Sequence, residues 1–163
     1  MMEQCKLVYD TLNKMQIKYN VVEHPKVVTT EEADKFIEGM EGVRTKTLFL
    51  CNKKNTAFYL LVMDGTKRLD IKKLETAAQD KKIRFCSPLQ LMDKMGLSPG
   101  EVSLFGLLNN TEKDIKVLLD REMLSQRLIS FHPNDNTKTV FITIDDMYRF
   151  LKECGFVCEE LDL

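Results

Sequence analysis

Three separated segments of this chain hold groups that could act on a polar substrate. Lys46 stands in the apolar run 45–50, where its ammonium group must either reach solvent or point into a cleft. Glycines bound the segment 100–106, and backbone N–H groups beside glycine can approach a substrate closely because no Cβ intervenes. His132 lies in the run 131–137, and a neutral imidazole could donate to a carbonyl group near pH 7. The three segments therefore offer a cation, backbone donors and an imidazole.

Each of these groups also has a purely structural interpretation. Lys46 could be an ordinary charge at the edge of a strand. The glycine-bounded segment could form a tight turn followed by a bulge in a strand. His132 could end a strand without touching a substrate, while Asn134, Asn136 and Thr137 fix the following turn through side-chain bonds to the backbone. The residues alone leave both interpretations open.

The motifs of the common hydrolases and nucleotide-binding proteins are absent from the sequence. It has no G-x-S-x-G elbow, no Walker glycine loop and no H-E-x-x-H pair. Its two histidines are too few for a histidine-rich metal site, and its five cysteines contain no C-x-x-C pair. We therefore expect no metal ion, no cofactor and no disulfide framework, with the cysteines reduced and mostly buried.

Positive charge is concentrated in the middle third of the sequence. Residues 44–84 contain eleven Lys or Arg and four Asp or Glu, a balance of +7, whereas the whole chain carries −1. Such a cluster could face the phosphates of a nucleic acid, or it could be the solvated side of strands and a helix. Its members are Arg44, Lys46, Lys53, Lys54, Lys67, Arg68, Lys72, Lys73, Lys81, Lys82 and Arg84.

Hydrophobic spacing and capping residues predict five helices. Val8, Leu12 and Met15 recur at the spacing of one helical face. Thr29 and Glu32 have the signature of a capping box. The predicted helices cover 3–15, 30–38, 71–79 with Asp70 as N-cap, a segment opened by Ser87 and Pro88 that stops at Gly96, and a last one capped by Asp145 or Asp146 that ends near Gly155.

Apolar runs between these helices predict short strands. Two of them, 47–51 and 57–63, are separated by the polar turn 52–55 and should form a β-hairpin. The other predicted strands cover 19–23, 83–86, 102–108, 115–119, 129–131, 139–144 and 157–161. Strands in this order, with few β-α-β crossovers, favour an α+β fold with a mixed, mostly antiparallel sheet and flanking helices.

Length and composition favour one domain over 1–163. A chain of 163 residues can bury roughly two thirds of its unfolded surface in one core, and it contains no linker or internal repeat. No apolar stretch approaches the roughly 20 residues of a membrane helix, and the polar N-terminus has no signal-peptide pattern. We expect no membrane association and a cytoplasmic location.

The segments around Lys46, 96–107 and 131–137, taken in this order and with two short strands following the lysine, resemble the YbaK/ProX family of aminoacyl-tRNA deacylases. These are free-standing editing domains related to the insertion domain of bacterial prolyl-tRNA synthetase. The resemblance covers nearly the whole chain. The run Phe-His-Pro-Asn-Asp-Asn-Thr is most similar to the branch that edits alanyl-tRNA(Pro).

The resemblance implies roles for individual residues. Lys46 matches the lysine most tied to activity in the family, where it could bind the terminal phosphate or ribose of the tRNA or polarise the scissile carbonyl. The family's Gly-x-x-x-Pro element matches 100–104, with Leu104 in place of proline. His132 matches a residue of the pocket that sizes the amino acid. The substrate-binding residues implied in this way are Gly100, Val102, Ser103, Leu104, Gly106, His132 and Asn134.

The function that the resemblance implies is trans-editing: hydrolysis of the ester of mischarged tRNA(Pro), foremost alanyl-tRNA(Pro), without metal or cofactor. Aminoacyl-tRNA is then the partner, and a link to prolyl-tRNA synthetase is conceivable. Cysteinyl-tRNA(Pro) deacylation and a non-catalytic module that binds tRNA or an amino acid are the alternatives, and Leu104 favours the second. The cations assigned to tRNA are Lys53, Lys54, Lys67, Arg68, Lys72 and Lys73.

Overall fold

The computed structural model describes residues 2–26, 35–135 and 137–163. The helices are α1 (Met2–Lys14), α3 (Ile71–Ala78), α4 (Pro88–Met95), α5 (Ile144–Cys154) and the 3-10 helices η1 (Leu104–Asn109) and η2 (Arg121–Ser125). The strands are β1 (Asn20–Glu23), β2 (Thr45–Cys51), β3 (Phe58–Asp64), β4 (Arg84–Phe85), β5 (Ile115–Asp120), β6 (Leu128–Phe131), β7 (Lys138–Thr143) and β8 (Cys158–Leu161). The predicted helix over 30–38 falls mainly outside the described residues.

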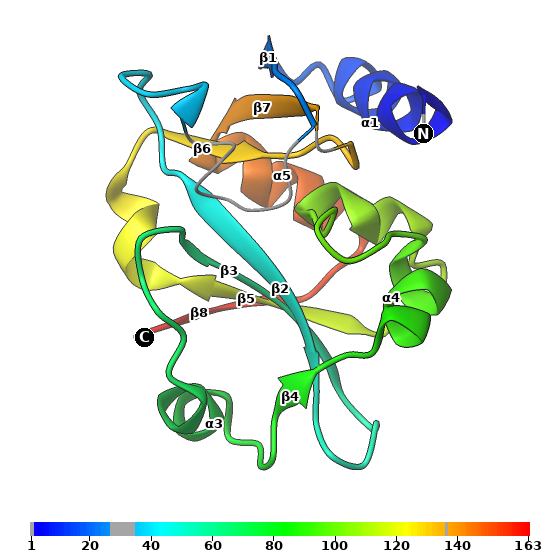
Figure 1. The fold of residues 1–163 in the computed structure, drawn as a ribbon, viewed down its shortest axis with the longest axis vertical. Coiled ribbons are helices and arrows are strands. Elements are labelled where there is room, and N and C mark those ends of the chain that lie inside the picture. The colour runs from blue at the N-terminus through cyan, green and yellow to red at the C-terminus, as the bar shows by residue number, and fades with distance from the viewer. Residues whose placement is uncertain (1, 27–34, 136) are drawn as a thin grey trace.

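The strands form two sheets, which confirms the α+β class. The larger has the order β4-β2-β3-β5-β8: β2 is antiparallel to β3 and β4, whereas β5 is parallel to β3 and β8. The smaller sheet, β1-β7-β6, is antiparallel throughout. Most strand pairs are therefore antiparallel, as predicted, but they are divided between two sheets. In Figure 1, β2 runs from the small sheet at the top of the view to the β4 edge at the bottom.

Two apolar clusters cover the two faces of the larger sheet. On one face, Phe49 and Val117 belong to a core shared with the small sheet and with α1, α4 and α5. On the other face, Leu50 and Leu61 pack with Leu74 of α3. Each strand thus alternates between two buried layers, which is why β3 and β5 are continuously apolar.

Local capping signals placed two helices correctly. Asp70 accepts the backbone N–H of Lys73 at 3.2 Å at the start of α3. Ser87 and the Gln90 side chain form a reciprocal capping box at the start of α4, which ends at the left-handed Gly96. The N-cap prediction for α5 was wrong, because Thr143 accepts the Asp146 N–H at 3.0 Å. Threonine and aspartate are both good N-caps, so sequence alone does not choose between them.

The predicted strand over 102–108 is also wrong, because this apolar run forms the 3-10 helix η1. The Ser103 hydroxyl accepts the Phe105 N–H at 3.2 Å and starts the turn. Gly106 then packs so tightly that a Cβ would lie 2.6 Å from Met95 Cε and 2.7 Å from Leu97 Cδ1. Short apolar runs fit a buried strand or a buried helical turn equally well, so periodicity could not decide.

None of the helices in the three described ranges has the length and apolar character required to cross a membrane.

Candidate functional site

The site is built where β2 joins the two sheets. Val43, just before β2, forms a parallel bridge with Ile129 of β6. Its N–H donates to the Leu128 carbonyl at 2.9 Å, and its carbonyl accepts the Ser130 N–H at 3.2 Å. The Thr45 hydroxyl donates to the Ser130 carbonyl at 2.5 Å. These bonds fix the start of β2 beside β6.

This register brings Lys46 and His132 to the same face of the junction. Val43 and Ile129 both point into the main core, and successive strand residues point to opposite faces. Three residues farther along each parallel segment, Lys46 and His132 therefore share the opposite face. Lys46 is partly exposed, and no carboxylate in the described ranges pairs with it. Its ammonium group is thus available to a substrate.

His132 is held as a neutral imidazole with one nitrogen occupied. Burial lowers the pKa of His132 below its usual 6.5, and nearby His24 acts in the same direction. Nδ1 lies 3.2 Å from the Lys138 carbonyl oxygen, which can only accept, so Nδ1 carries the proton. Nε2 then has a lone pair. In this tautomer Nε2 cannot make the predicted donation to a substrate carbonyl. It can instead accept a hydrogen bond.

A second histidine lies beside the first, and sequence reasoning gave it little weight. His24 Nδ1 lies 3.0 Å from the Pro25 carbonyl, and Nε2 lies 3.0 Å from the Thr139 hydroxyl. The His24 ring also stacks on Phe36, with centroids 5.4 Å apart. The only signal in the sequence was the strand-ending pair His24–Pro25, because Thr139 is 115 positions away.

The loop before η1 is fastened to the backbone of His132. The Ser103 hydroxyl donates a short hydrogen bond to the His132 carbonyl while it caps η1. Gly100 is exposed and has φ +88°, a left-handed conformation that favours glycine. Val102 lies between them, partly buried. Gly100, Val102 and Ser103 therefore lie in a loop that is bonded to His132, and their binding of substrate stays a prediction.

Three other residues predicted to bind substrate have packing roles. Leu104 is fully buried in the main core. Gly106 is buried against α4, so its missing Cβ permits helix packing rather than the approach of a substrate. Asn134, also buried, donates from its amide to the Phe105 carbonyl at 3.2 Å and adopts φ +59°. These residues shape the site from behind.

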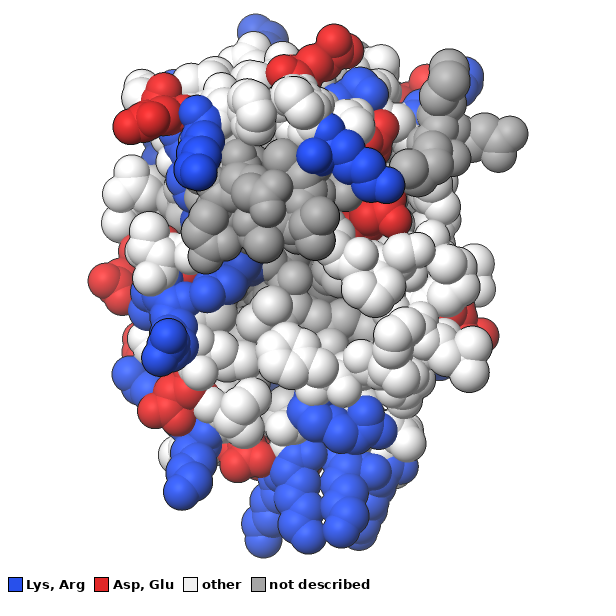
Figure 2. All heavy atoms as spheres, viewed as in Figure 1, with Lys and Arg blue, Asp and Glu red and all other residues white. Residues whose placement is uncertain are grey.

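Most of the cations assigned to tRNA are exposed at the end of the molecule opposite the small sheet. Lys53 and Lys54 lie in the β2–β3 turn, and Lys72 and Lys73 lie on α3. Arg68 is exposed in the preceding loop. In Figure 2, Lys and Arg side chains gather at the bottom of the view, where Figure 1 shows this turn, α3 and β4.

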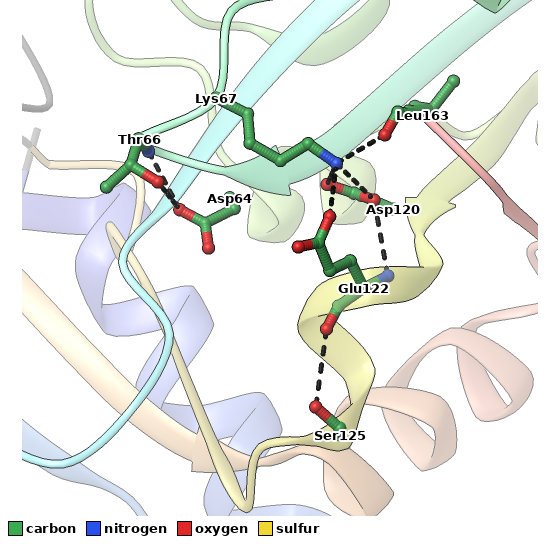
Figure 3. A network of polar contacts seen from close by, with 7 residues as sticks. All are labelled: Asp64, Thr66, Lys67, Asp120, Glu122, Ser125 and Leu163. Carbon is green, nitrogen blue, oxygen red and sulfur yellow. Dashed lines mark hydrogen bonds and ion pairs between the residues drawn. The ribbon is translucent and has the colours of Figure 1, made fainter.

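Lys67 is the exception, because its ammonium group is used inside the protein (Figure 3). Nζ lies 3.1 Å from Oδ2 of the fully buried Asp120, 2.9 Å from Glu122 Oε2 and 2.5 Å from the Leu163 main-chain oxygen. Burial alone would lower the pKa of Lys67, but its bonds to Glu122 and Asp120 raise it. We therefore no longer assign Lys67 to the group of cations that bind tRNA.

Within the described ranges, no group of three or more His, Cys, Asp or Glu side chains is arranged to hold a metal ion. All five cysteines are free: Cys5 and Cys51 are buried, and Cys86, Cys154 and Cys158 are partly buried. The chemistry available at the junction is that of Lys46, the two histidines, and the loop that ends at Ser103.

Comparison with known proteins places this chain in a family. The Aminoacyl-tRNA editing domain matches residues 24–150. The chain is 31% identical over 163 residues to Prolyl-tRNA editing protein ProX of Acetoanaerobium sticklandii, covering 99% of each chain. It is 31% identical over 150 residues to Prolyl-tRNA synthetase associated domain-containing protein 1 of Danio rerio, covering 91% of this chain and 81% of the relative.

Solved structures show the same fold. One, assigned as a trans-editing enzyme for prolyl-tRNA synthetase, has a TM-score of 0.74 at 21% identity and covers 98% of this chain and 97% of its own. The matched region 24–150 includes Lys46, the loop at 100–103 and both histidines. The chain therefore belongs to the aminoacyl-tRNA editing domain family, as its sequence indicated, and is an aminoacyl-tRNA deacylase.

Proposed function

We propose that this protein hydrolyses the ester of mischarged tRNA(Pro) in trans, with alanyl-tRNA(Pro) as its main substrate. The observation that carries the proposal is the bridge between Val43 and Ile129, from which we infer that Lys46 and His132 share a face beside the loop that Ser103 bonds to His132. The full-length likeness to a protein named Prolyl-tRNA editing protein ProX supports the choice of tRNA.

The reaction needs little more than positioning and charge, because an aminoacyl ester is already reactive. A water oxygen attacks the ester carbonyl, the carbonyl oxygen becomes an oxyanion, and the bond to the ribose oxygen then breaks. The proton lost by the water ends on that ribose oxygen. Lys46 supplies positive charge at the ribose and terminal phosphate, or at the developing oxyanion. The N–H groups of the 100–103 loop are further donors to the same oxygen.

His132 contributes an acceptor rather than a donor. With Nδ1 bonded to the Lys138 carbonyl, Nε2 can accept a hydrogen bond from the ammonium group of the amino acid. That bond would hold the amino acid by its one constant group and leave its side chain to be sized by the surrounding walls. A small pocket would accept alanine and exclude proline by crowding.

Leu104 does not weigh against catalysis. The leucine that replaces the family's proline is buried in the core, so the replacement removes no group from the site. This observation favours an active deacylase over a module that has kept only binding.

We assign the exposed cations Lys53, Lys54, Arg68, Lys72 and Lys73 to the tRNA backbone. Lys53 lies seven residues along an extended strand and turn from Lys46, roughly 23 Å at about 3.3 Å per residue. A ligand that reaches both must be elongated and negatively charged, which fits an acceptor stem whose 3′ end enters the junction. A complex with prolyl-tRNA synthetase stays a prediction.

The test is incubation of the protein with alanyl-, cysteinyl- and prolyl-tRNA(Pro), following loss of the ester and release of the free amino acid. We expect rapid loss from alanyl-tRNA(Pro) and slow loss from prolyl-tRNA(Pro). Faster loss from cysteinyl-tRNA(Pro) would reassign the substrate. Binding of all three without ester loss would overturn the proposed activity.

A further inference from the structure

Arg44 is a partly buried cation whose guanidinium group donates hydrogen bonds to backbone carbonyls of the protein itself. Nη1 donates to the Gly42 carbonyl at 2.7 Å, and Nη2 donates to the Ile37 carbonyl at 2.6 Å and the Met40 carbonyl at 2.5 Å. The group also lies over the Phe141 ring, 5.5 Å from its centroid. Although Arg44 belongs to the basic middle third, it binds the protein's own backbone.

Two of these carbonyls, those of Met40 and Gly42, accept no backbone N–H among the described residues. Residues 37–40 form a hydrogen-bonded turn, with the Met40 N–H donating to the Ile37 carbonyl at 3.1 Å. Carbonyls at the end of such a turn need outside donors. A planar guanidinium can serve three of them and stack on an aromatic ring at once, whereas a lysine ammonium is a point charge. Arg44 is therefore specifically suited to hold this turn.

The turn is coupled to the two histidines through Phe36. Phe36 precedes it and stacks on His24, which bonds Thr139 on the face that also bears His132. Ile37 is buried, so the turn cannot shift without exposing it. Arg44 directly precedes β2, and Lys46, two residues farther along the same extended backbone, lies by alternation on the same face. The short segment 44–46 thus carries both Lys46 and the arginine that holds the turn 37–42.

We propose that Arg44 is a positioning residue for the deacylation: it fixes the turn 37–42, and with it Phe36, at a set distance from Lys46. It thereby sets the width of the space for the amino acid side chain. This inference rests on the proposed function, because that function makes the width of the site a matter of substrate choice.

A second arginine offers a matched control on the same turn. Arg127 makes a two-pronged ion pair with Glu41, with Nε 2.9 Å from Oε2 and Nη2 3.0 Å from Oε1. Both side chains are mostly exposed, at 64% and 57%. A solvated pair of this kind contributes little. Removing it deletes an arginine contact to the turn without emptying a buried position.

The experiment compares Arg44→Gln, Arg44→Lys and Arg127→Gln with the unaltered protein. The kcat and KM for alanyl- and prolyl-tRNA(Pro) are measured together with amide hydrogen exchange of residues 37–43. For Arg44→Gln we expect faster exchange in the turn and a fall of about tenfold in the preference for alanine over proline, because a wider site crowds proline less. Arg44→Lys should fall between the two, and Arg127→Gln should keep the preference within about twofold.

Unchanged preference in folded Arg44→Gln, or an equal loss in Arg127→Gln, would overturn the positioning role. Should Arg44→Gln fail to fold, Arg44→Lys decides by the same two measurements, because it keeps the charge. Failure of the unaltered protein to deacylate any of the tRNAs would instead refute the proposed function, and the role of Arg44 in it would fall as well.

Discussion

The two ends of strand β2 use their cations in opposite ways. At the junction with the small sheet, Arg44, which directly precedes β2, donates to backbone carbonyls, and Lys46 lies by alternation on the face that we assign to the site. At the far end, Lys53 and Lys54 project into solvent with no carboxylate partner in the described part of the chain. Positive charges that are close in the sequence can therefore serve different functions. The hydrogen-bond and ion-pair partners of each side chain distinguish these functions, whereas the number of charges does not.

The largest effect should come from Lys46→Ala at the junction. We expect kcat/KM for alanyl-tRNA(Pro) to fall by about 100-fold or more, because one charge opposed to a developing oxyanion is lost. The midpoint of thermal unfolding should stay close to that of the unaltered protein, since Lys46 is partly exposed. Lys53→Ala, at the other end of the strand, should retain kcat. An equal fall in kcat in the two variants would contradict the different roles given to the two ends of β2.

Lys67→Met should cost stability rather than tRNA affinity. It leaves Asp120 fully buried without its cation, and breaking such a pair costs about 3 kcal/mol in the free energy of unfolding. Urea unfolding measures this loss. Lys116→Met is the control, because the Lys116–Glu159 pair is exposed and should contribute less than about 1 kcal/mol. Weaker tRNA binding by Lys67→Met at full stability would restore Lys67 to the group of cations that bind tRNA.

The double change Lys53→Glu with Lys72→Glu should weaken tRNA binding about tenfold and flatten its dependence on salt, because fewer phosphate contacts release fewer counterions. Filter binding at several salt concentrations measures both. Lys18→Glu with Lys152→Glu makes the same change in charge at exposed positions elsewhere. If both pairs weaken binding equally, only net charge matters and the surface has no special role.

The smallest effect concerns pH. The unfolded chain binds a proton at His132 near pH 6.5, whereas burial keeps the folded form neutral to lower pH. The unfolded state then holds more protons, so stability falls as the pH drops below 6.5 toward the lowered pKa. Urea unfolding at pH 7.5 and 5.5 should show a smaller difference for His132→Asn than for the unaltered protein. The Lys53→Glu, Lys72→Glu protein should follow the unaltered one.

Sequence signals correctly predicted the features of the fold that depend on hydrogen bonds between residues close in the sequence. The caps at Asp70 and Ser87, the stop at Gly96 and the β2–β3 hairpin all depend on neighbours in sequence, and all are confirmed. The failures have distant causes. The partner of Lys67 is 53 positions away, and the contact that makes η1 a helix against α4 is invisible to the apolar pattern of 102–108.

The candidate site could likewise be predicted only in part, because some of its contacts join residues far apart in the sequence. Lys46, the 100–103 loop and His132 were predicted from a resemblance in motif order; in the structure Ser103 bonds to His132, and the shared face of Lys46 and His132 is inferred from the Val43–Ile129 bridge. Leu104 and Asn134 lie in the same motifs but have buried side chains, and the backbone of Gly106 packs against Met95 and Leu97; no spacing rule reports such packing. His24 and Arg44 act through tertiary contacts that only the folded chain reveals.

The bridge between Val43 and the β6 strand also sets when the protein can work. Its hydrogen-bonded residues are 87 positions apart, so it closes late in synthesis and adds a large loop-closure cost to folding. A nascent chain that has emerged only through β5 carries Lys46 and His24, but it lacks His132 and the strand β7 that holds β1 and the His24 ring. The junction that brings together the segments of Lys46, His24 and His132 therefore forms only when β6 and β7 dock.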